Sequence, residues 1–237
     1  IDADVRNSIK LIELCKKEKK IIAVVMQKRF DKATIYLKKL VKKNILGKII
    51  SAKVDVFMYR DKKYFSRRKW IRNSKMIGGG ITLHHAVHSI DQIIYILDKK
   101  ISNVSFWKSN SFRKLSIEDT SGGWIKFDND LVASVNATVC AYPELKNRIE
   151  IYGEKLALCL EKNKIYKLPF NKNGSINLLK SFSTNQLGNH ADVWKSYNEA
   201  LNYNKKVPNL GRFIINTEKT INYMYESSRK GRIINFK

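Results

Sequence analysis

The sequence predicts an α+β protein with one large, mainly antiparallel open sheet and helices on one of its faces, preceded by a helix and a strand typical of an α/β unit. Three patterns predict this fold class. Apolar and polar residues alternate in short segments between residues 48 and 169, apolar residues recur at helical spacing toward both ends of the chain, and one continuous apolar run occupies Ile21–Met26. With 237 residues, 43% of them hydrophobic, the chain can bury a substantial core.

The first 26 residues have the pattern of a helix followed by a buried strand. Val5, Ile9 and Ile12 lie near one face of a helix over residues 2–17. The run Ile21–Met26 indicates a strand covered on both faces, as in a parallel sheet. Such a strand needs neighbours, so we expect residues 1–26 to be the remnant of an α/β domain and residues 27–237 to form a second domain.

The remaining residues predict one sheet flanked by helices. Asp31 is placed to cap a helix that runs to Gly47, and residues 48–60 alternate as a strand does. Further strands are expected at 104–109, 121–127, 131–138, 147–152, 156–161, 165–169 and 233–236, with 128–130 as a tight hairpin turn. Further helices are expected at 81–97, 189–201 and 213–230. This order favours a sheet with helices packed on one face.

The chain is strongly basic, with 46 Lys and Arg against 21 Asp and Glu and a net charge of +25. The lysines are spread along the whole chain, and the sequence holds no zinc finger, basic-region zipper or aromatic RNA-binding motif. We therefore interpret the charge as a solvated basic surface, which would also favour a small anionic substrate, and we expect no nucleic-acid partner.

No segment of the sequence predicts membrane insertion or export. No apolar run approaches the roughly 18 residues of a membrane-spanning helix, and the first residues lack the layout of a signal peptide. The three cysteines, Cys15, Cys140 and Cys159, are far apart and odd in number, which is typical of reduced thiols. We therefore expect no membrane partner and a cytoplasmic location.

One segment concentrates the residues that carry chemistry: Gly78–Gly80, followed by a predicted helix with three of the four histidines. His84 and His88 are four residues apart and share a helical face, with Asp91 one turn beyond. The glycines let the backbone approach a ligand or another segment closely. Spacing alone leaves three interpretations: partly buried structural histidines, a metal site, and acid–base catalysis by His88, whose ordinary pKa of about 6.5 suits proton transfer.

Strings spread over the whole chain resemble the Gfo/Idh/MocA oxidoreductases, the relatives of glucose–fructose oxidoreductase and inositol dehydrogenase. They are residues 27–30 (QKRF), 45–49 (ILGKI), Trp70, 78–80 (GGG), 88–91 (HSID), 148–153 (RIEIYG) and 225–231 (YESSRKG). The glycine triplet followed by His88 and Asp91 is the most specific of these strings.

That resemblance implies an NAD(P)-dependent enzyme with an N-terminal Rossmann domain and a C-terminal domain built on a large sheet. Residues 1–26 would belong to the dinucleotide-binding domain, and residues 27–237 would form the substrate and oligomerisation domain. His88 would take a hydroxyl proton as hydride leaves the neighbouring carbon. His84 stands where the family commonly carries Asp, so we expect it to contact substrate. The resemblance also implies a homo-oligomer, a dimer or tetramer formed through the sheet.

Two family features are missing from the sequence. The glycine-rich turn that binds the dinucleotide and the Glu-Lys-Pro motif that assists catalysis occur nowhere in it. In the family both features lie N-terminal to the part that corresponds to this chain. We therefore expect an N-terminally truncated member that binds NAD or NADP poorly and catalyses little by itself. Micromolar NADH binding by the chain would contradict this expectation.

The same resemblance suggests further site residues. Those expected near the cofactor are Gln27, Arg29, Trp70 and Arg72, and those expected near the substrate are Arg60, Tyr64, Asp91 and His84. Structural alternatives remain for several of them. Gln27 and Arg29 would also suit a domain junction, Arg72 a solvated loop, and Asp91 the orientation of His88.

The sequence therefore predicts the C-terminal part of an NAD(P)-dependent oxidoreductase that acts on a secondary hydroxyl of a sugar, cyclitol or nucleotide-linked sugar. The basic charge and His84 favour a sugar nucleotide. The alternative is a non-catalytic, sugar-responsive regulatory or interaction module of the same fold. A basic nucleic-acid binder ranks third.

Overall fold

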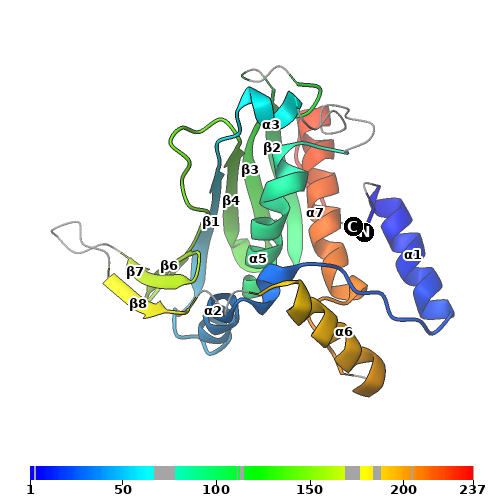
Figure 1. Cartoon of the computed structure of the whole chain (residues 1–237). Helices are drawn as coiled ribbons and strands as arrows, with labels where there is room; N and C mark the ends of the chain where they lie inside the picture. The colour runs from blue at the N-terminus through cyan, green and yellow to red at the C-terminus, as the bar shows by residue number, and fades with distance from the viewer. Residues whose placement is uncertain are drawn as a thin grey trace.

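A nine-stranded sheet forms the body of the molecule, and the helices α5 and α7 lie across one of its faces (Figure 1). The computed structural model describes residues 1–2, 4–66, 78–110, 112, 115–168, 177–183, 188–203 and 205–236. Eight strand pairs join the nine strands, and seven of these pairs are antiparallel. The expected α+β class with a large, mainly antiparallel open sheet is confirmed.

The described helices are α1 (Val5–Lys17), η1 (Gln27–Phe30), α2 (Lys32–Lys42), α3 (Lys62–Ser66), η3 (Thr82–Ala86), α5 (Val87–Leu97), η4 (Asp128–Asp130), α6 (His190–Tyr203) and α7 (Gly211–Lys230). The described strands are β1 (Ile49–Phe57), β2 (Ile101–Ser109), β3 (Thr120–Phe127), β4 (Val132–Thr138), β5 (Arg148–Gly153), β6 (Ala157–Glu161), β7 (Lys164–Leu168), β8 (Asn177–Ser181) and β9 (Ile234–Asn235).

The sheet order is β8-β7-β6-β5-β1-β4-β3-β2-β9. β1 is central and pairs in parallel with β4, from Ser51 opposite Val132 to Phe57 opposite Thr138. Parallel neighbours require a crossover, and the chain between β1 and β4 includes α5, which packs against β1. This crossover places the histidine-bearing helix on the sheet.

The two faces of the sheet differ because side chains alternate along each strand. Phe106 is buried and its ring meets Tyr225 of α7 edge to face, with the ring centroids 6.5 Å apart. Its neighbour Trp107 and the cross-strand residue Trp124 therefore point to the opposite face, and they are 61% and 51% exposed. The helices cover one face, and the other presents large aromatic side chains to solvent.

The predicted strand Ile21–Met26 is wrong. The segment forms only one isolated bridge, between Ala23 and Leu210, and most of its side chains are half-buried. Its backbone bonds go to the start of α7, where Val24 donates to the Asn209 carbonyl oxygen at 2.9 Å and Gly211 donates to the Ile22 carbonyl oxygen at 2.9 Å. A strand buried on both faces needs a strand on each side, and the described chain offers this segment only the turn before α7.

Smaller differences from the prediction concern two short elements, the end of one strand and the cap of one helix. α3 and β8 were not expected, and the predicted residue Pro169 lies outside the described residues. Asp31 stands at the N-terminal cap of α2 as predicted, but its carboxylate makes no capping bond. It accepts a hydrogen bond from the Gly188 backbone N–H at 2.6 Å instead, because the segment before α6 passes close to it.

The glycine triplet serves close packing between segments of the chain. A Cβ atom at Gly79 would lie 2.1 Å from the Tyr225 hydroxyl oxygen, and one at Gly80 would lie 2.0 Å from the Glu118 carbonyl oxygen. Tyr225 in turn donates a hydrogen bond to Glu118 Oε1 at 2.7 Å. The start of the histidine-bearing helix is therefore held against α7 and the segment before β3.

We expect Gly80→Ala to lower the free energy of unfolding by about 3 kcal/mol, since the backbone carbonyl at Glu118 has little room to move. Gly122→Ala in β3 is the matched control, because the nearest atom to its added Cβ is the Asn136 Oδ1, 3.3 Å away. Urea unfolding of both variants measures the difference. Equal losses of stability would show that the close approach at Gly80 is unimportant.

Candidate functional site

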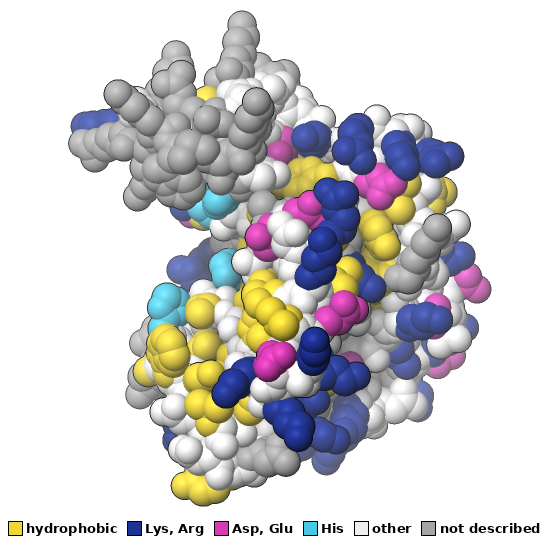
Figure 2. Space-filling model, turned by 90° about the vertical axis from the view of Figure 1, so that its right-hand side faces the viewer, with side chains coloured by type: hydrophobic (Ala, Val, Ile, Leu, Met, Phe, Trp, Pro, Cys, Tyr) yellow, Lys and Arg dark blue, Asp and Glu magenta, His cyan; other side chains and the backbone are white. Residues whose placement is uncertain are grey.

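The histidines stand where a π-helical turn joins an α-helix. His84 and His85 lie in η3 and His88 lies in the first turn of α5, and all three side chains are half-buried. A π-helical turn is wider than an α-helical one and occurs frequently at functional sites. Figure 2 shows histidine side chains gathered along one edge of the molecule, whereas Lys and Arg are spread over the rest of that face.

His88 has the properties of a proton acceptor. Its Nδ1 atom is buried and has no hydrogen-bond partner among the described residues. Burial lowers the pKa of His88, the Lys28 ammonium and the His190 side chain lower it further, and Asp91 opposes them. The imidazole is therefore neutral at pH 7, with a lone pair free to accept a proton.

His85 is also neutral. Burial is the largest cause, and with the nearby Arg60 it lowers the pKa of His85 to about 4. His85 therefore adds no positive charge to the site at pH 7.

Asp91 and Arg29 form a buried ion pair behind the histidines. The Arg29 Nη2 donates to Asp91 Oδ1 at 2.6 Å and its Nε donates to Asp91 Oδ2 at 2.8 Å. The Thr217 hydroxyl of α7 donates to the same Oδ1 at 2.7 Å, and the Arg29 Nη1 donates to the Pro208 carbonyl oxygen at 2.6 Å. The pair joins η1, α5 and α7, which agrees with the structural alternative for Arg29. The Asp91 carboxylate is bonded to Arg29 and Thr217, whereas the alternative for Asp91 was the orientation of His88. The contacts of Arg29 and Asp91 with substrate and cofactor remain predictions.

Asp91→Ala is expected to lower the free energy of unfolding by about 3–5 kcal/mol, because it leaves the buried Arg29 cation without its counter-charge. Glu226→Ala in the exposed Glu226–Lys230 pair is the control and should cost less than about 1 kcal/mol. Urea titrations of the two variants provide the measurement. Comparable losses of stability in the two variants would mean that the buried Arg29–Asp91 pair contributes no more to folding than an exposed ion pair.

Arg60 and Tyr64 lie together at the end of β1. The Arg60 guanidinium lies 5.5 Å from the Tyr64 ring centroid, and its Nη1 donates to Glu144 Oε2 at 3.0 Å. Gln27 begins η1, and its Oε1 atom is buried without a hydrogen-bond partner in the described chain. The two other expected cofactor residues, Trp70 and Arg72, lie outside the described residues.

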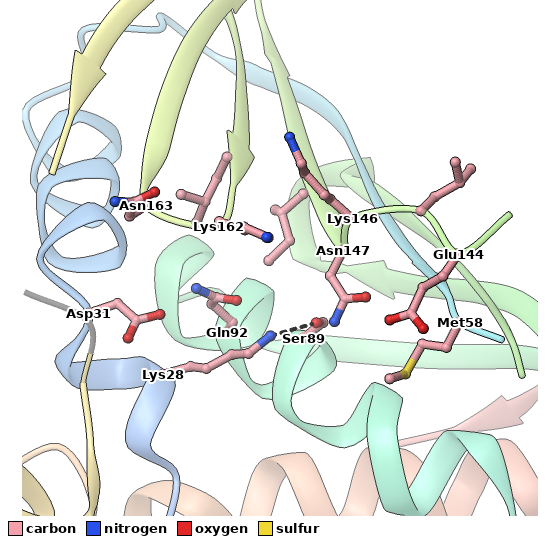
Figure 3. A pocket seen from close by; sticks show the side chains of 13 residues that line it. Lys28, Asp31, Met58, Ser89, Gln92, Glu144, Lys146, Asn147, Lys162 and Asn163 are labelled. Carbon is pink, nitrogen blue, oxygen red and sulfur yellow. Dashed lines mark hydrogen bonds between the residues drawn. The ribbon is translucent and has the colours of Figure 1, made fainter. Parts of the chain in front are cut away.

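A cavity of about 740 Å³ opens between α5, the start of β5 and the end of β6. Figure 3 shows polar side chains from four parts of the chain turned toward it. Its lining consists of Lys28, Asp31, Met58, Ser89, Gln92, Glu144, Leu145, Lys146, Asn147, Ile149, Leu160, Lys162 and Asn163. One contact links the cavity to the predicted site: Glu144, which lines the cavity, pairs with Arg60. Ser89, also in the lining, follows His88 in sequence.

None of these thirteen lining residues was predicted as a site residue from the sequence. Lys28 lies between Gln27 and Arg29, which were expected in the site, and Lys162 lies in a turn between two expected strands. A lysine in a hairpin turn is ordinarily solvated, so the sequence gives no signal that Lys162 lines a cavity.

Two buried charges of opposite sign line this cavity. The Lys28 Nζ donates to the Ser89 hydroxyl at 3.2 Å, and burial lowers its pKa while Asp31 opposes that effect. Burial is also the main cause that raises the pKa of Asp31 to about 6, with Asp192 adding to it and the Gly188 N–H and Lys28 opposing it. Asp31 therefore ionises within an accessible pH range.

The raised pKa of Asp31 makes a testable contribution to stability. The folded chain holds this proton more tightly than the unfolded chain, so ionisation of Asp31 costs stability as the pH rises from the ordinary value of 3.8 through about 6. Asp31→Asn removes this ionisation and keeps an oxygen that can accept from Gly188. Relative to the unaltered chain, the variant should gain roughly 1–3 kcal/mol between about pH 4.5 and about pH 7.5. Urea unfolding at both pH values measures this, and a pH-independent difference would contradict it.

Metal-binding clusters and membrane-spanning helices are both absent from the residues that the structure describes. No group of three or more His, Cys, Asp or Glu side chains is arranged to hold a metal ion. No helix combines the length and the apolar character needed to cross a bilayer.

A histidine-bearing helix lies across one face of a large, mainly antiparallel sheet, which defines the described chain as an α+β domain of the open-sheet class. The family description "GFO/IDH/MocA C-terminal domain" matches residues 34–158. The chain belongs to the Gfo/Idh/MocA family of oxidoreductases, and the resemblance drawn from the sequence is confirmed. A comparison with curated protein sequences gives no match.

Solved structures share the fold. The WlbA dehydrogenase from Bordetella pertussis, in complex with NADH and UDP-GlcNAcA, has a TM-score of 0.85 at 20% identity over 99% of this chain and 70% of its own. The aldose-aldose oxidoreductase from Caulobacter crescentus, complexed with glycerol, has a TM-score of 0.82 at 17% identity over 99% and 69%. Levoglucosan dehydrogenase, in complex with NADH and levoglucosan, has a TM-score of 0.84 at 15% identity over 99% and 71%.

Proposed function

We propose that this chain is the substrate domain of an NAD(P)-dependent oxidoreductase that oxidises a secondary hydroxyl of a sugar, cyclitol or nucleotide-linked sugar. The observation that carries the proposal is His88, a neutral imidazole whose buried Nδ1 atom has no hydrogen-bond partner in the described chain and whose sequence neighbour Ser89 lines the cavity. Family membership and the NADH-bound solved relatives support the class of reaction.

His88 acts as the base in this proposal. Oxidation of a secondary alcohol breaks the O–H and C–H bonds and leaves a carbonyl, so a proton and a hydride must depart. His88 accepts the proton at a ring nitrogen, and the oxidised nicotinamide supplies the hydride acceptor when it is bound. His84, four residues earlier on the same segment, is placed to bind substrate hydroxyls, and Arg60 and Tyr64 extend that surface.

NAD or NADP is the proposed cofactor. Two of the solved relatives named above hold NADH, and a third solved relative, GenD2, is in complex with NAD. Gln27 fits a cofactor contact, because its buried Oε1 lacks a hydrogen-bond partner in the described chain. We assign residues 1–26 to the dinucleotide-binding domain, as a remnant of it, and residues 27–237 to the substrate domain. Most of the dinucleotide contacts in this proposal belong to the glycine-rich turn of the family's dinucleotide-binding domain, which residues 1–26 do not contain.

A homo-oligomer formed through the sheet is part of the proposal. Trp107 in β2 and Trp124 in β3 lie on the face without helices and are 61% and 51% exposed. Aromatic residues are enriched in the cores of interfaces. A dimer or tetramer that covers this face would bury both tryptophans.

His88→Ala should lower kcat by at least about a hundredfold in the polypeptide that joins this chain to its dinucleotide-binding domain, assayed with NAD or NADP and nucleotide sugars. In the unaltered protein, kcat/KM should decrease only at pH values below about 6.5, because the pKa of His88 is lowered and the base accepts a proton only when it is neutral. Lys195→Ala, on the exposed face of α6, is the control and should keep its turnover.

Unchanged turnover in His88→Ala would remove this residue from the mechanism. An unaltered protein that binds nucleotide sugar but turns over none with either cofactor would favour the non-catalytic, sugar-responsive module instead.

A further inference from the structure

We propose that the cavity between α5 and β5–β6 binds an oxyanion group of the substrate, a phosphate or a carboxylate, and that Lys28 and Lys162 are the cations that hold it. The inference rests on the proposed function only in calling the bound molecule a substrate. The anion site itself is defined by the cavity.

Polar groups from separate elements converge on the cavity. Figure 3 shows the side chains of Lys28, Gln92, Asn147 and Lys162 pointing into the same space from η1, α5, the segment before β5 and the β6–β7 turn. Lysine ammonium groups and side-chain amides all donate hydrogen bonds. The Gln92 Nε2 atom already donates to the Thr34 hydroxyl, so Lys28, Asn147 and Lys162 are the donors that an oxyanion in this space would meet (Figure 3).

The ion pairs of the described residues leave a surplus of positive charge in the cavity. Glu144 is paired with Arg60 at 3.0 Å, and Lys146 is paired with Glu161 at 3.1 Å. Lys28 and Lys162 enter no ion pair within the described chain, and only Asp31 remains on the acidic side, already bonded to the Gly188 N–H. Two cations therefore face one carboxylate.

Of the two cations, Lys28 is the more desolvated, and a bound anion would stabilise its charge. Its ammonium is bonded to one neutral partner, the Ser89 hydroxyl, although burial already lowers its pKa. A buried charge is costly unless a counter-charge compensates it, and a ligand oxyanion would provide one. The same charge lowers the pKa of His88, so an anion at Lys28 would be bound next to the proposed base.

The cavity has the size of a small-molecule site. Its volume of about 740 Å³ lies within the usual range for ligand pockets, which accommodates a sugar that carries a phosphate or carboxylate. A neutral sugar would leave both ammonium groups without a counter-charge. The cavity therefore selects negatively charged sugars over neutral ones.

Binding of three probes to the purified chain, without cofactor, tests the inference by isothermal titration calorimetry. Glucose 1-phosphate supplies a phosphate, glucuronate a carboxylate, and glucose neither. At least one anionic sugar should bind about tenfold or more tightly than glucose, and added salt should weaken that binding. Preference between the two anionic probes identifies the phosphate or the carboxylate as the natural group.

Two variants assign the binding to the cavity. Lys28→Met and Lys162→Asn should each weaken the anionic probe by about tenfold, whereas Lys10→Met on the exposed surface of α1 should leave it unchanged. Lys162 has a φ of 53°, a left-handed conformation that Asn tolerates, so this variant keeps the turn and decides the question even where Lys28→Met fails to fold.

Equal affinity for glucose, absence of anionic binding, or unaltered binding in Lys162→Asn would each overturn the inference. The measurement involves no hydride transfer. A failure of the proposed enzymatic function would therefore leave the binding result unchanged, and loss of the anion site would leave the test of His88 unchanged.

Discussion

The arrangement of the helical layer depends on the buried ion pair between Arg29 and Asp91. Both side chains are almost completely buried, at 3% and 1% exposed, and the Thr217 hydroxyl donates to the same carboxylate. Because the desolvation cost is recovered only when every donor and acceptor is satisfied, the pair tolerates one geometry. That geometry fixes η1 against α5 and α7. It therefore sets where Gln27 and Lys28 stand relative to the histidines.

The glycine triplet complements this constraint at the other end of the helix. Gly79 and Gly80 let the chain pass against Tyr225 and Glu118 at distances that no side chain would permit, and the π-helical turn follows immediately. His84 and His88 are thus presented from a segment anchored at both ends. Partial burial lowers the pKa of His88 below its ordinary value and keeps the imidazole neutral. The packing of the segment therefore sets the protonation state that proton acceptance requires.

The basic character of the chain has two different consequences. Most lysines are spread over the surface, as Figure 2 shows, and they contribute a general field that attracts anions. Lys28 and Lys162 are different because the fold brings them from distant parts of the sequence to one cavity. Lys28 is half-buried, so its charge acts more strongly on a neighbouring anion than the charge of a surface lysine does, and the exposed Lys162 adds a second cation at the same cavity. Net charge alone would not distinguish the two groups.

The sequence by itself determined the fold class, the family and the histidine-bearing segment, since periodicity and the glycine–His–Asp spacing are local properties. It failed at Ile21–Met26, because an apolar run looks the same whether strands or a turn lie beside it. Only the tertiary structure decided that Asp91 pairs with Arg29 and that Asp31 bonds Gly188, because their partners lie 62 and 157 residues away. The cavity likewise depended on the tertiary structure. Its walls come from strands and helices whose adjacency follows from sheet order, and sheet order is a property of the whole chain.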